Sequence, residues 1–186
     1  MTSSNTESAE SHLCATCGMC CNGVLFEIVL LGSNDSAKRL AAAGLKLKHK
    51  KRRHYIQQPC PAYKGAQCCI YDERPERCRK FECRQLIAMK KGEITEAQAQ
   101  EKIRHALARV SQVEQLFRLA GERNSNRPLI KRYDKIMEQP IDASLDPQAA
   151  ALRAELTRVM EELETLLKND FRSAPPPVPA SIPEAQ

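Results

Sequence analysis

The segment CATCGMCC, residues 14–21, places four cysteines within eight positions of the chain. It contains two overlapping C-x2-C units that share Cys17, and a tight turn at this spacing brings two thiols within reach of one metal ion. Gly18 relieves backbone strain inside one of these units. Because adjacent cysteines seldom both point at one ion, we expect Cys21 to face a second metal or another iron of a cluster.

A second group of cysteines follows further along the chain, and no cysteine occurs after it. Thiols that serve only for packing have no reason to cluster, and an odd total of nine argues against a framework of disulfides. The sequence therefore predicts a thiolate metal site in the first half of the chain. The second group consists of Cys60, Cys68, Cys69, Cys78 and Cys83.

Length and composition limit the choices of fold and compartment. A chain of 186 residues can form one buried domain, or a small domain with an appended helical part. Residues 1–12 are polar and do not resemble a signal peptide, and the most apolar stretch, residues 24–31, is far too short to cross a bilayer. We therefore expect a cytoplasmic protein with no membrane partner, in which thiols stay reduced.

The net charge of +6 is concentrated in the cysteine-rich half, where the segment KLKHKKRRH spans residues 46–54. Such a run can neutralise phosphates, which makes a basic nucleic-acid-binding module one alternative. No aromatic or base-contacting pattern accompanies the run apart from Tyr55, so we interpret it as a solvated connector and do not expect nucleic acid as the partner.

Local patterns predict short elements in the first half. Residues 24–31 favour a strand after the Asn22-Gly23 turn, residues 33–36 offer a cap for a short helix over residues 37–43, and residues 84–91 favour another helix. The basic segment over residues 45–58 is expected to be extended.

Two long helices are predicted in the second half. The first begins at a capping box of Thr95 and Gln98 and ends at Gly121, and the second begins at Asp146. Apolar residues recur at steps of three and four in both, which favours an antiparallel pair within one chain over a coiled coil with a second copy. A shorter helix is expected over residues 129–138.

The cysteines and their neighbours form a longer pattern. It is C-x2-C-G-x-C-C at residues 14–21, C-P-x-Y at residues 60–63 and C-x-I-Y-x2-R-P-x2-C-R-x-F-x-C at residues 68–83. This pattern resembles the CxxCxxCC (YkgJ-type) cysteine-cluster proteins of bacteria, a family described as zinc- or iron-chelating. In that alignment Cys69 falls at a variable position and is the expected bystander. The resemblance implies eight metal ligands, Cys14, Cys17, Cys20, Cys21, Cys60, Cys68, Cys78 and Cys83.

Other residues of the pattern have expected supporting roles. Pro75 starts the helical turn that carries Cys78, and Arg74 and Arg79 donate hydrogen bonds to thiolates or carbonyls. We expect Tyr71 and Phe81 to form a small hydrophobic lid.

The identity of the metal stays open at this point. Eight thiolates suit two zinc ions in closed four-sulfur sites, or iron held in one or two iron–sulfur clusters such as [4Fe–4S]. The spacing from residue 14 to residue 20 is similar to the opening of bacterial ferredoxin sites, but the order of Cys21 and Cys60 departs from that pattern.

The predicted fold is α+β, with a small loop-rich cysteine domain that contains a short strand pair, followed by an antiparallel helical hairpin. We expect a disordered tail at 1–12, a metal-binding domain at 13–92, a helical region at 93–172 and a disordered proline-rich tail at 173–186. Metal binding of unassigned cellular role is the favoured function, and the helical region offers a surface to a protein partner. The resemblance also keeps an iron–sulfur redox or protein-modifying enzyme as an alternative, because a related cysteine region occurs in a bacterial lysine methylase of flagellin.

Overall fold

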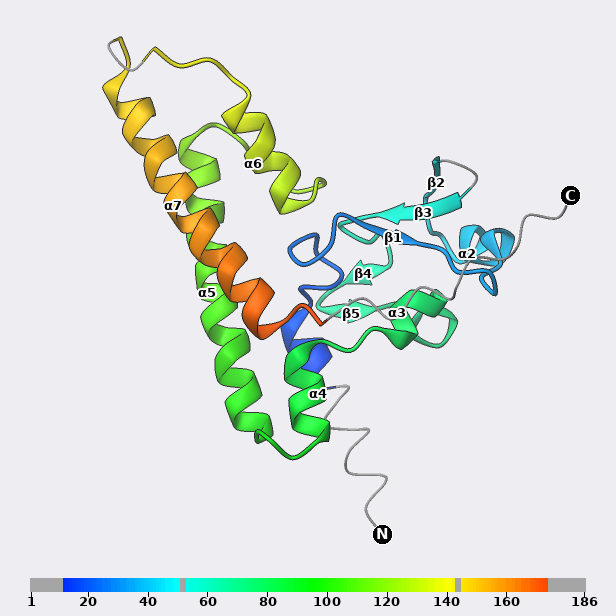
Figure 1. The fold of residues 1–186 in the computed structure, drawn as a ribbon. Coiled ribbons are helices and arrows are strands. Elements are labelled where there is room, and N and C mark those ends of the chain that lie inside the picture. The colour runs from blue at the N-terminus through cyan, green and yellow to red at the C-terminus, as the bar shows by residue number, and fades with distance from the viewer. Residues whose placement is uncertain (1–11, 51–52, 143–144, 174–186) are drawn as a thin grey trace, which may run out of the picture.

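The computed structural model describes residues 12–50, 53–142 and 145–173 (Figure 1). The fold is α+β, as predicted. A loop-rich part with two small sheets and short helices lies beside a pair of long helices. Within the described ranges, no helix combines the length and the apolar character that a membrane span requires.

The larger sheet has three antiparallel strands in the order β1-β3-β2. Strand β3 (Arg53–Gln57) is central, and its Ile56 pairs with Val29 of β1 (Ile28–Leu30) and with Leu47 of β2 (Leu47–Lys50). The basic segment, expected to be extended, therefore supplies two of the three strands. The predicted strand over residues 24–31 is confined to its last part, because the backbone N–H of Leu25 binds the carbonyl of Met19 instead of a neighbouring strand.

Short elements carry the rest of the cysteine-rich half. Strands β4 (Tyr63–Lys64) and β5 (Gln67–Cys68) form a second antiparallel pair. The predicted helix after the residue 33–36 segment is α2 (Ala37–Ala42), capped by Ser36. A 3-10 turn, η1 (Tyr71–Glu73), precedes α3 (Glu76–Lys80), and α4 (Arg84–Lys90) follows as predicted.

The two long helices are α5 (Glu96–Leu119) and α7 (Pro147–Asp170), and they run antiparallel (Figure 1). Thr95 and Gln98 form the predicted capping box, and Asp146 caps α7 through the backbone N–H of Ala149 at 2.8 Å. The shorter helix, α6 (Leu129–Met137), packs beside them. The antiparallel helical hairpin is thus confirmed.

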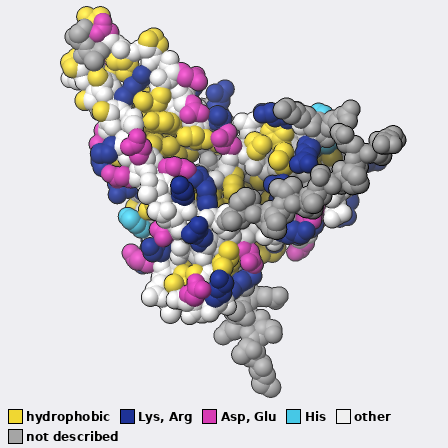
Figure 2. Space-filling model, viewed as in Figure 1, with side chains coloured by type: hydrophobic (Ala, Val, Ile, Leu, Met, Phe, Trp, Pro, Cys, Tyr) yellow, Lys and Arg dark blue, Asp and Glu magenta, His cyan; other side chains and the backbone are white. Residues whose placement is uncertain are grey.

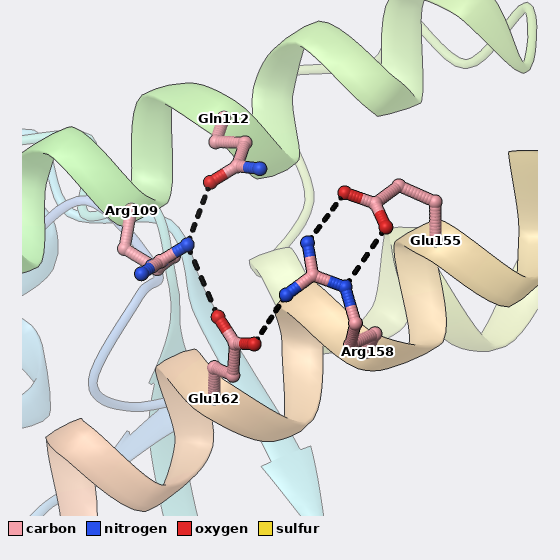
Figure 3. A network of polar contacts seen from close by, with 5 residues as sticks. All are labelled: Arg109, Gln112, Glu155, Arg158 and Glu162. Atoms are coloured by element: carbon pink, nitrogen blue, oxygen red, sulfur yellow. Dashed lines mark hydrogen bonds and ion pairs between the residues drawn. The ribbon is translucent and has the colours of Figure 1, made fainter.

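Polar side chains also join the long helices (Figure 3). Glu162 of α7 accepts from Arg109 of α5 at 3.1 Å and also pairs with Arg158. Arg158 makes a bidentate pair with Glu155, in which its Nη2 donates to Oε1 at 2.6 Å and its Nε donates to Oε2 at 2.9 Å. These groups line the solvent side of the pair, where ion pairs contribute little to stability, so apolar burial supplies most of the packing energy.

The main hydrophobic core spans the predicted boundary at residue 92. Phe117 of α5 and Phe171 after α7 are fully buried in it, together with Leu13 and Met19 from the first cysteine segment. A smaller second cluster holds the three-stranded sheet and has four buried residues, Leu40, Leu45, Ile56 and Ala62. The first cysteine segment therefore rests on the helical pair, whereas the sheet has little core of its own.

Candidate metal centre

The first four cysteines lie on one helical turn and the loop that leaves it. Residues 12–17 are helical, so Cys14 and Cys17 are three residues apart on one face. Gly18, with φ of +64°, ends the turn, and its carbonyl accepts the N–H of Cys21 at 2.9 Å and of Asn22 at 3.0 Å. This tight loop places Cys20 and Cys21 directly after the helix.

The second cysteine segment is attached to the first through the backbone. The N–H of Cys60 donates to the carbonyl of Cys21 at 2.8 Å. Cys68 lies opposite Tyr63 in the β4–β5 pair, and the N–H of Cys69 binds the carbonyl of Ala62 at 2.8 Å. Strand pairing therefore brings Cys60 and Cys68 to the same end of this small sheet.

The last two cysteines belong to short helices. Cys78 lies in α3, where the nearby charge of Arg74 lowers the pKa of its thiol against a larger effect of burial. Cys83 is the N-cap residue of α4, where no side-chain cap hydrogen bond forms and the nearby backbone N–H groups of Leu86 and Gln85 lower the pKa of its thiol against the larger effect of burial. Such donors stabilise a thiolate, although burial still raises the pKa of Cys83 overall.

The thiols fall into two groups by the charges that they impose on one another. In the first group, burial and, to a smaller extent, repulsion from the negative charges of Cys83 and Cys14 raise the pKa of Cys17 to about 12. Burial also raises the pKa of Cys20, with the next largest effects from Cys17 and Cys83 and smaller ones from Cys21 and Cys14. We call Cys14, Cys17, Cys20 and Cys83 the first thiol group.

The second group joins Cys21 to the later segment. Burial, then repulsion from Cys60, Cys78 and Cys68, and last from Cys14 of the first group, raise the pKa of Cys21 to about 12. The pKa of Cys78 also rises to about 12 through burial, then through Cys60 and Cys68. We call Cys21, Cys60, Cys68 and Cys78 the second thiol group.

Packing places four of the eight cysteines in line with these groups. Cys17, Cys20 and Cys83 contact the main hydrophobic core, whereas Cys60 contacts the smaller cluster under the sheet. Cys69 is exposed and has no part in either group. None of the nine cysteines, all of which lie in described residues, forms a disulfide.

Comparison with protein families gives one match. The sequence model of one family, CxxCxxCC, described as "Putative zinc- or iron-chelating domain", matches residues 13–108, just over half of the chain. The chain belongs to the CxxCxxCC family. No curated protein and no solved structure matches it.

The match extends past the last cysteine into the long helix α5. The CxxCxxCC domain thus includes Ala99, Ile103 and Ala106, which are buried against the main core. The helix is consequently part of the domain's packing and not only an appendage to its cysteines.

The thiols of this CxxCxxCC domain have the chemistry that zinc and iron prefer. In the described ranges, however, no three His, Cys, Asp or Glu side chains are arranged so that they could hold a metal ion as they stand. A protonated thiol is a poor metal ligand, and neighbouring thiolates repel one another, so a cation bound between these thiols would favour their ionised form.

Tyr63 lies between the two thiol groups. Burial raises the pKa of its phenol, followed by the charges of Cys21 in the second group and Cys17 in the first. In the sequence, Tyr63 stands out only as the tyrosine of the C-P-x-Y segment at residues 60–63. Its position could not be inferred from spacing, because it depends on how β4 folds back over the first cysteine loop.

The expected hydrophobic lid is wrong in part. Phe81 packs edge-on against Phe26, with ring centroids 4.8 Å apart. Tyr71 is exposed, and the guanidinium of Arg74 stacks on its ring at 3.5 Å. Because the Arg74 Nε also donates to the carbonyl of Tyr71 at 2.7 Å, the pair braces the turn before Cys78.

Proposed function

We propose that this chain binds two metal centres, each held by one of the two thiol groups, and that the metals stabilise the fold of the cysteine-rich half. The observation that carries the proposal is the division of eight cysteines into two sets of four. Four thiolates complete the coordination of zinc or of ferrous iron and leave no open position for substrate. The family's description as zinc- or iron-chelating supports the same chemistry.

Electrostatics explains why the metal would be needed. Burial and mutual repulsion raise the pKa values of Cys17, Cys21 and Cys78 to about 12, so these thiols hold their protons near neutral pH when no metal is present. A divalent cation offsets the repulsion, and each bound thiol releases its proton. Metal affinity is therefore coupled to folding and to proton release.

The sparse core of the sheet supports a structural role for the second centre. The cluster under the sheet has four buried residues, too few to hold three strands by burial alone. The second thiol group joins Cys21 of the first loop, Cys60 and Cys68 of the β4–β5 region and Cys78 of α3. A metal bound there would link segments that few other contacts connect.

Anaerobic purification followed by quantification of zinc, iron and acid-labile sulfide tests the proposal. We expect two metal ions per chain, or two clusters if sulfide accompanies the iron, and unfolding of the cysteine-rich half on chelation. A single metal centre, or a fold that is unchanged without metal, would contradict it. Sulfide with broad visible absorption would also identify the iron–sulfur alternative.

The grouping has its own test. Cys83→Ser should remove one centre and Cys78→Ser the other, so their combination should remove both. Cys17→Ser with Cys83→Ser lies within one group and should lose no more metal than either change alone. A loss of both centres from that second pair would show that the grouping is wrong.

A further inference from the structure

A polar groove of about 580 Å³ lies between the sheet of the cysteine-rich half and the segment that leads into α6. Its volume is in the range of sites for small organic ligands. Side chains of the same charge line it from both sides, and Figure 2 shows Lys and Arg side chains both over α6 and over the neighbouring sheet. The basic residues that line the groove are Lys46, Lys48, Arg127, Lys131 and Lys135.

Positive charge exceeds negative charge in this groove. Asp134 and Glu138 are the acidic residues of its lining, against five basic ones. Lys131 pairs with Asp134 at 3.3 Å and with Glu27 at 3.4 Å, and Lys135 pairs with Glu122 at 2.7 Å. Lys46 and Arg127 have no ion-pair partner among the described residues, which leaves two cations directed to a ligand or to solvent.

Gln58 adds a second, independent feature to the groove. This lining residue is only 2% exposed, and its Oε1 has no hydrogen-bond donor among the described residues. Its backbone is fixed, since its N–H donates to the carbonyl of Glu27 at 3.0 Å. A buried acceptor without a donor is destabilising and uncommon, so rotation of the Gln58 amide toward the groove would let an N–H or O–H of a ligand supply the missing hydrogen bond.

We propose that this groove binds a small phosphorylated ligand that also carries an N–H or O–H donor, which is the chemistry of a mononucleotide or a sugar phosphate. The phosphate would be held by Lys46 and Arg127, and the donor would pair with Gln58 Oε1. None of the eight cysteines lines the groove, but Pro59 and Pro61 of its lining flank Cys60, so the shape of the groove rests on the proposed second metal centre. Lys46 and Lys48, interpreted from the sequence as part of a solvated connector, thus acquire a binding role.

Calorimetric titration of the full chain, as purified, tests this site. The probes are GMP and ribose 5-phosphate, with guanosine and inorganic phosphate as references. We expect at least one phosphorylated probe to bind at least tenfold more tightly than either reference. Preference for GMP would assign the donor to the base, and equal binding of the two probes would assign it to the sugar.

Variants separate this site from general attraction of anions. Lys46→Ala and Arg127→Ala should each weaken the better probe at least tenfold, whereas Lys168→Ala removes the same charge from α7, outside the groove, and should change nothing. Gln58→Leu should weaken that probe but leave binding of inorganic phosphate unchanged. Thermal unfolding of each variant checks that it is folded, and Gln58→Met replaces Gln58→Leu if the latter is not.

Three results would overturn the proposal. One is binding of both phosphorylated probes no tighter than inorganic phosphate. Another is an equal effect of Lys168→Ala and Arg127→Ala, which would indicate attraction by net charge alone. The third is binding of a single-stranded RNA oligonucleotide far more tightly than GMP, with the same dependence on Arg127, which would replace the small ligand with nucleic acid.

Discussion

The phenol of Tyr63 lies so close to the backbone of Gly18 that a Cβ atom on Gly18 would overlap Tyr63 Oη and lie 2.7 Å from Cζ. Gly18 stands between Cys17 and Cys20, and Tyr63 stands between Cys60 and Cys68. The two cysteine segments are therefore in close contact here, in addition to the backbone hydrogen bond between Cys60 and Cys21. Two features of this position require glycine: the lack of space for a Cβ atom and the positive φ of +64°.

Substitution of Gly18 should consequently damage the metal centres as well as the fold. Gly18→Ala has to displace the Tyr63 ring, which should destabilise the protein by about 1–3 kcal/mol beyond the cost of the backbone conformation. Because the ring lies between the two thiol groups, we expect metal content to fall in both. Chemical denaturation and metal quantification measure the two effects.

Gly92 provides a matched control. Its φ is +70°, close to that of Gly18, but a Cβ there would meet nothing within 4 Å. Gly92→Ala should therefore show the backbone cost alone, about 1–2 kcal/mol, and leave metal content unchanged. Equal destabilisation by the two substitutions would show that the Tyr63 contact contributes nothing.

The two adjacent cysteines at the end of β5 give a second prediction. Cys68 acts on the pKa values of Cys21 and Cys78, whereas Cys69 is exposed and is absent from both thiol groups. Cys68→Ser should remove one metal centre, and Cys69→Ser should leave both in place. Metal analysis of the two variants decides between them, and a loss of metal from Cys69→Ser would exchange their roles.

Local signals were sufficient to predict most of the helices. Thr95, Gln98 and Asp146 cap helices in the structure as their sequence patterns indicated. The apolar pattern was less accurate at the far end of α7, where steps of three and four lead to Leu166, but Leu167 is the buried residue and Leu166 is half-buried. A true helical repeat of 3.6 residues drifts against alternating steps of three and four, so the last turn faces the core one residue later.

Strands and site were harder to predict because both depend on distant partners. The first cysteine loop takes up the N–H of Leu25, which shortens the strand expected from residue 24. The family resemblance implied the eight cysteines as candidates but could not show that Cys83 lies near Cys17 and Cys20. That proximity follows from α4 packing on the main core, a tertiary contact without a local signal.

A buried ion pair between α5 and α6 gives a third prediction. The Arg132 side chain is 4% exposed, pairs through both terminal nitrogens with Glu114 and lies over the Phe117 ring at 4.6 Å. Glu114→Ala would leave a buried guanidinium without its counter-charge and should cost about 2–3 kcal/mol, a value reduced because Glu114 is 31% exposed.

Arg132→Met should lower the free energy of unfolding less than Glu114→Ala does. Arg132→Met keeps the packing volume without a buried charge, so adding it to Glu114→Ala should recover part of the lost stability. Urea denaturation of the two single variants and the double variant measures this coupling. A double variant less stable than Glu114→Ala would show that contacts of the Arg132 side chain matter more than its charge.

A fourth prediction concerns pH and the junction of α5 with α6. Glu122 is buried, and its carboxylate accepts from the Lys135 ammonium at 2.7 Å and from the backbone N–H of Asn124 at 2.6 Å. The hydrogen bond from Lys135, followed by that from Asn124, lowers the pKa of Glu122 below its ordinary value of 4.5. Between the lowered pKa of Glu122 in the folded protein and its ordinary pKa of 4.5 in the unfolded chain, the unfolded chain binds more protons than the folded one. The stability contributed by this carboxylate is therefore fully present above pH 4.5 and is lost as the pH falls through the lowered pKa.

Glu122→Gln should therefore lower the free energy of unfolding by about 1–2 kcal/mol at neutral pH, because the charge-assisted hydrogen bonds become neutral ones. The difference between wild type and variant should shrink as pH falls below 4.5, since the wild-type carboxyl group is then protonated as well. Denaturation curves collected across that range measure the difference directly, and effects of other carboxylates cancel in it. Glu138→Gln, at the exposed end of α6, is the control and should change stability less at neutral pH. A difference for Glu122→Gln that stays constant down to strongly acidic pH would mean that the amide and the carboxylate differ in packing and not in charge.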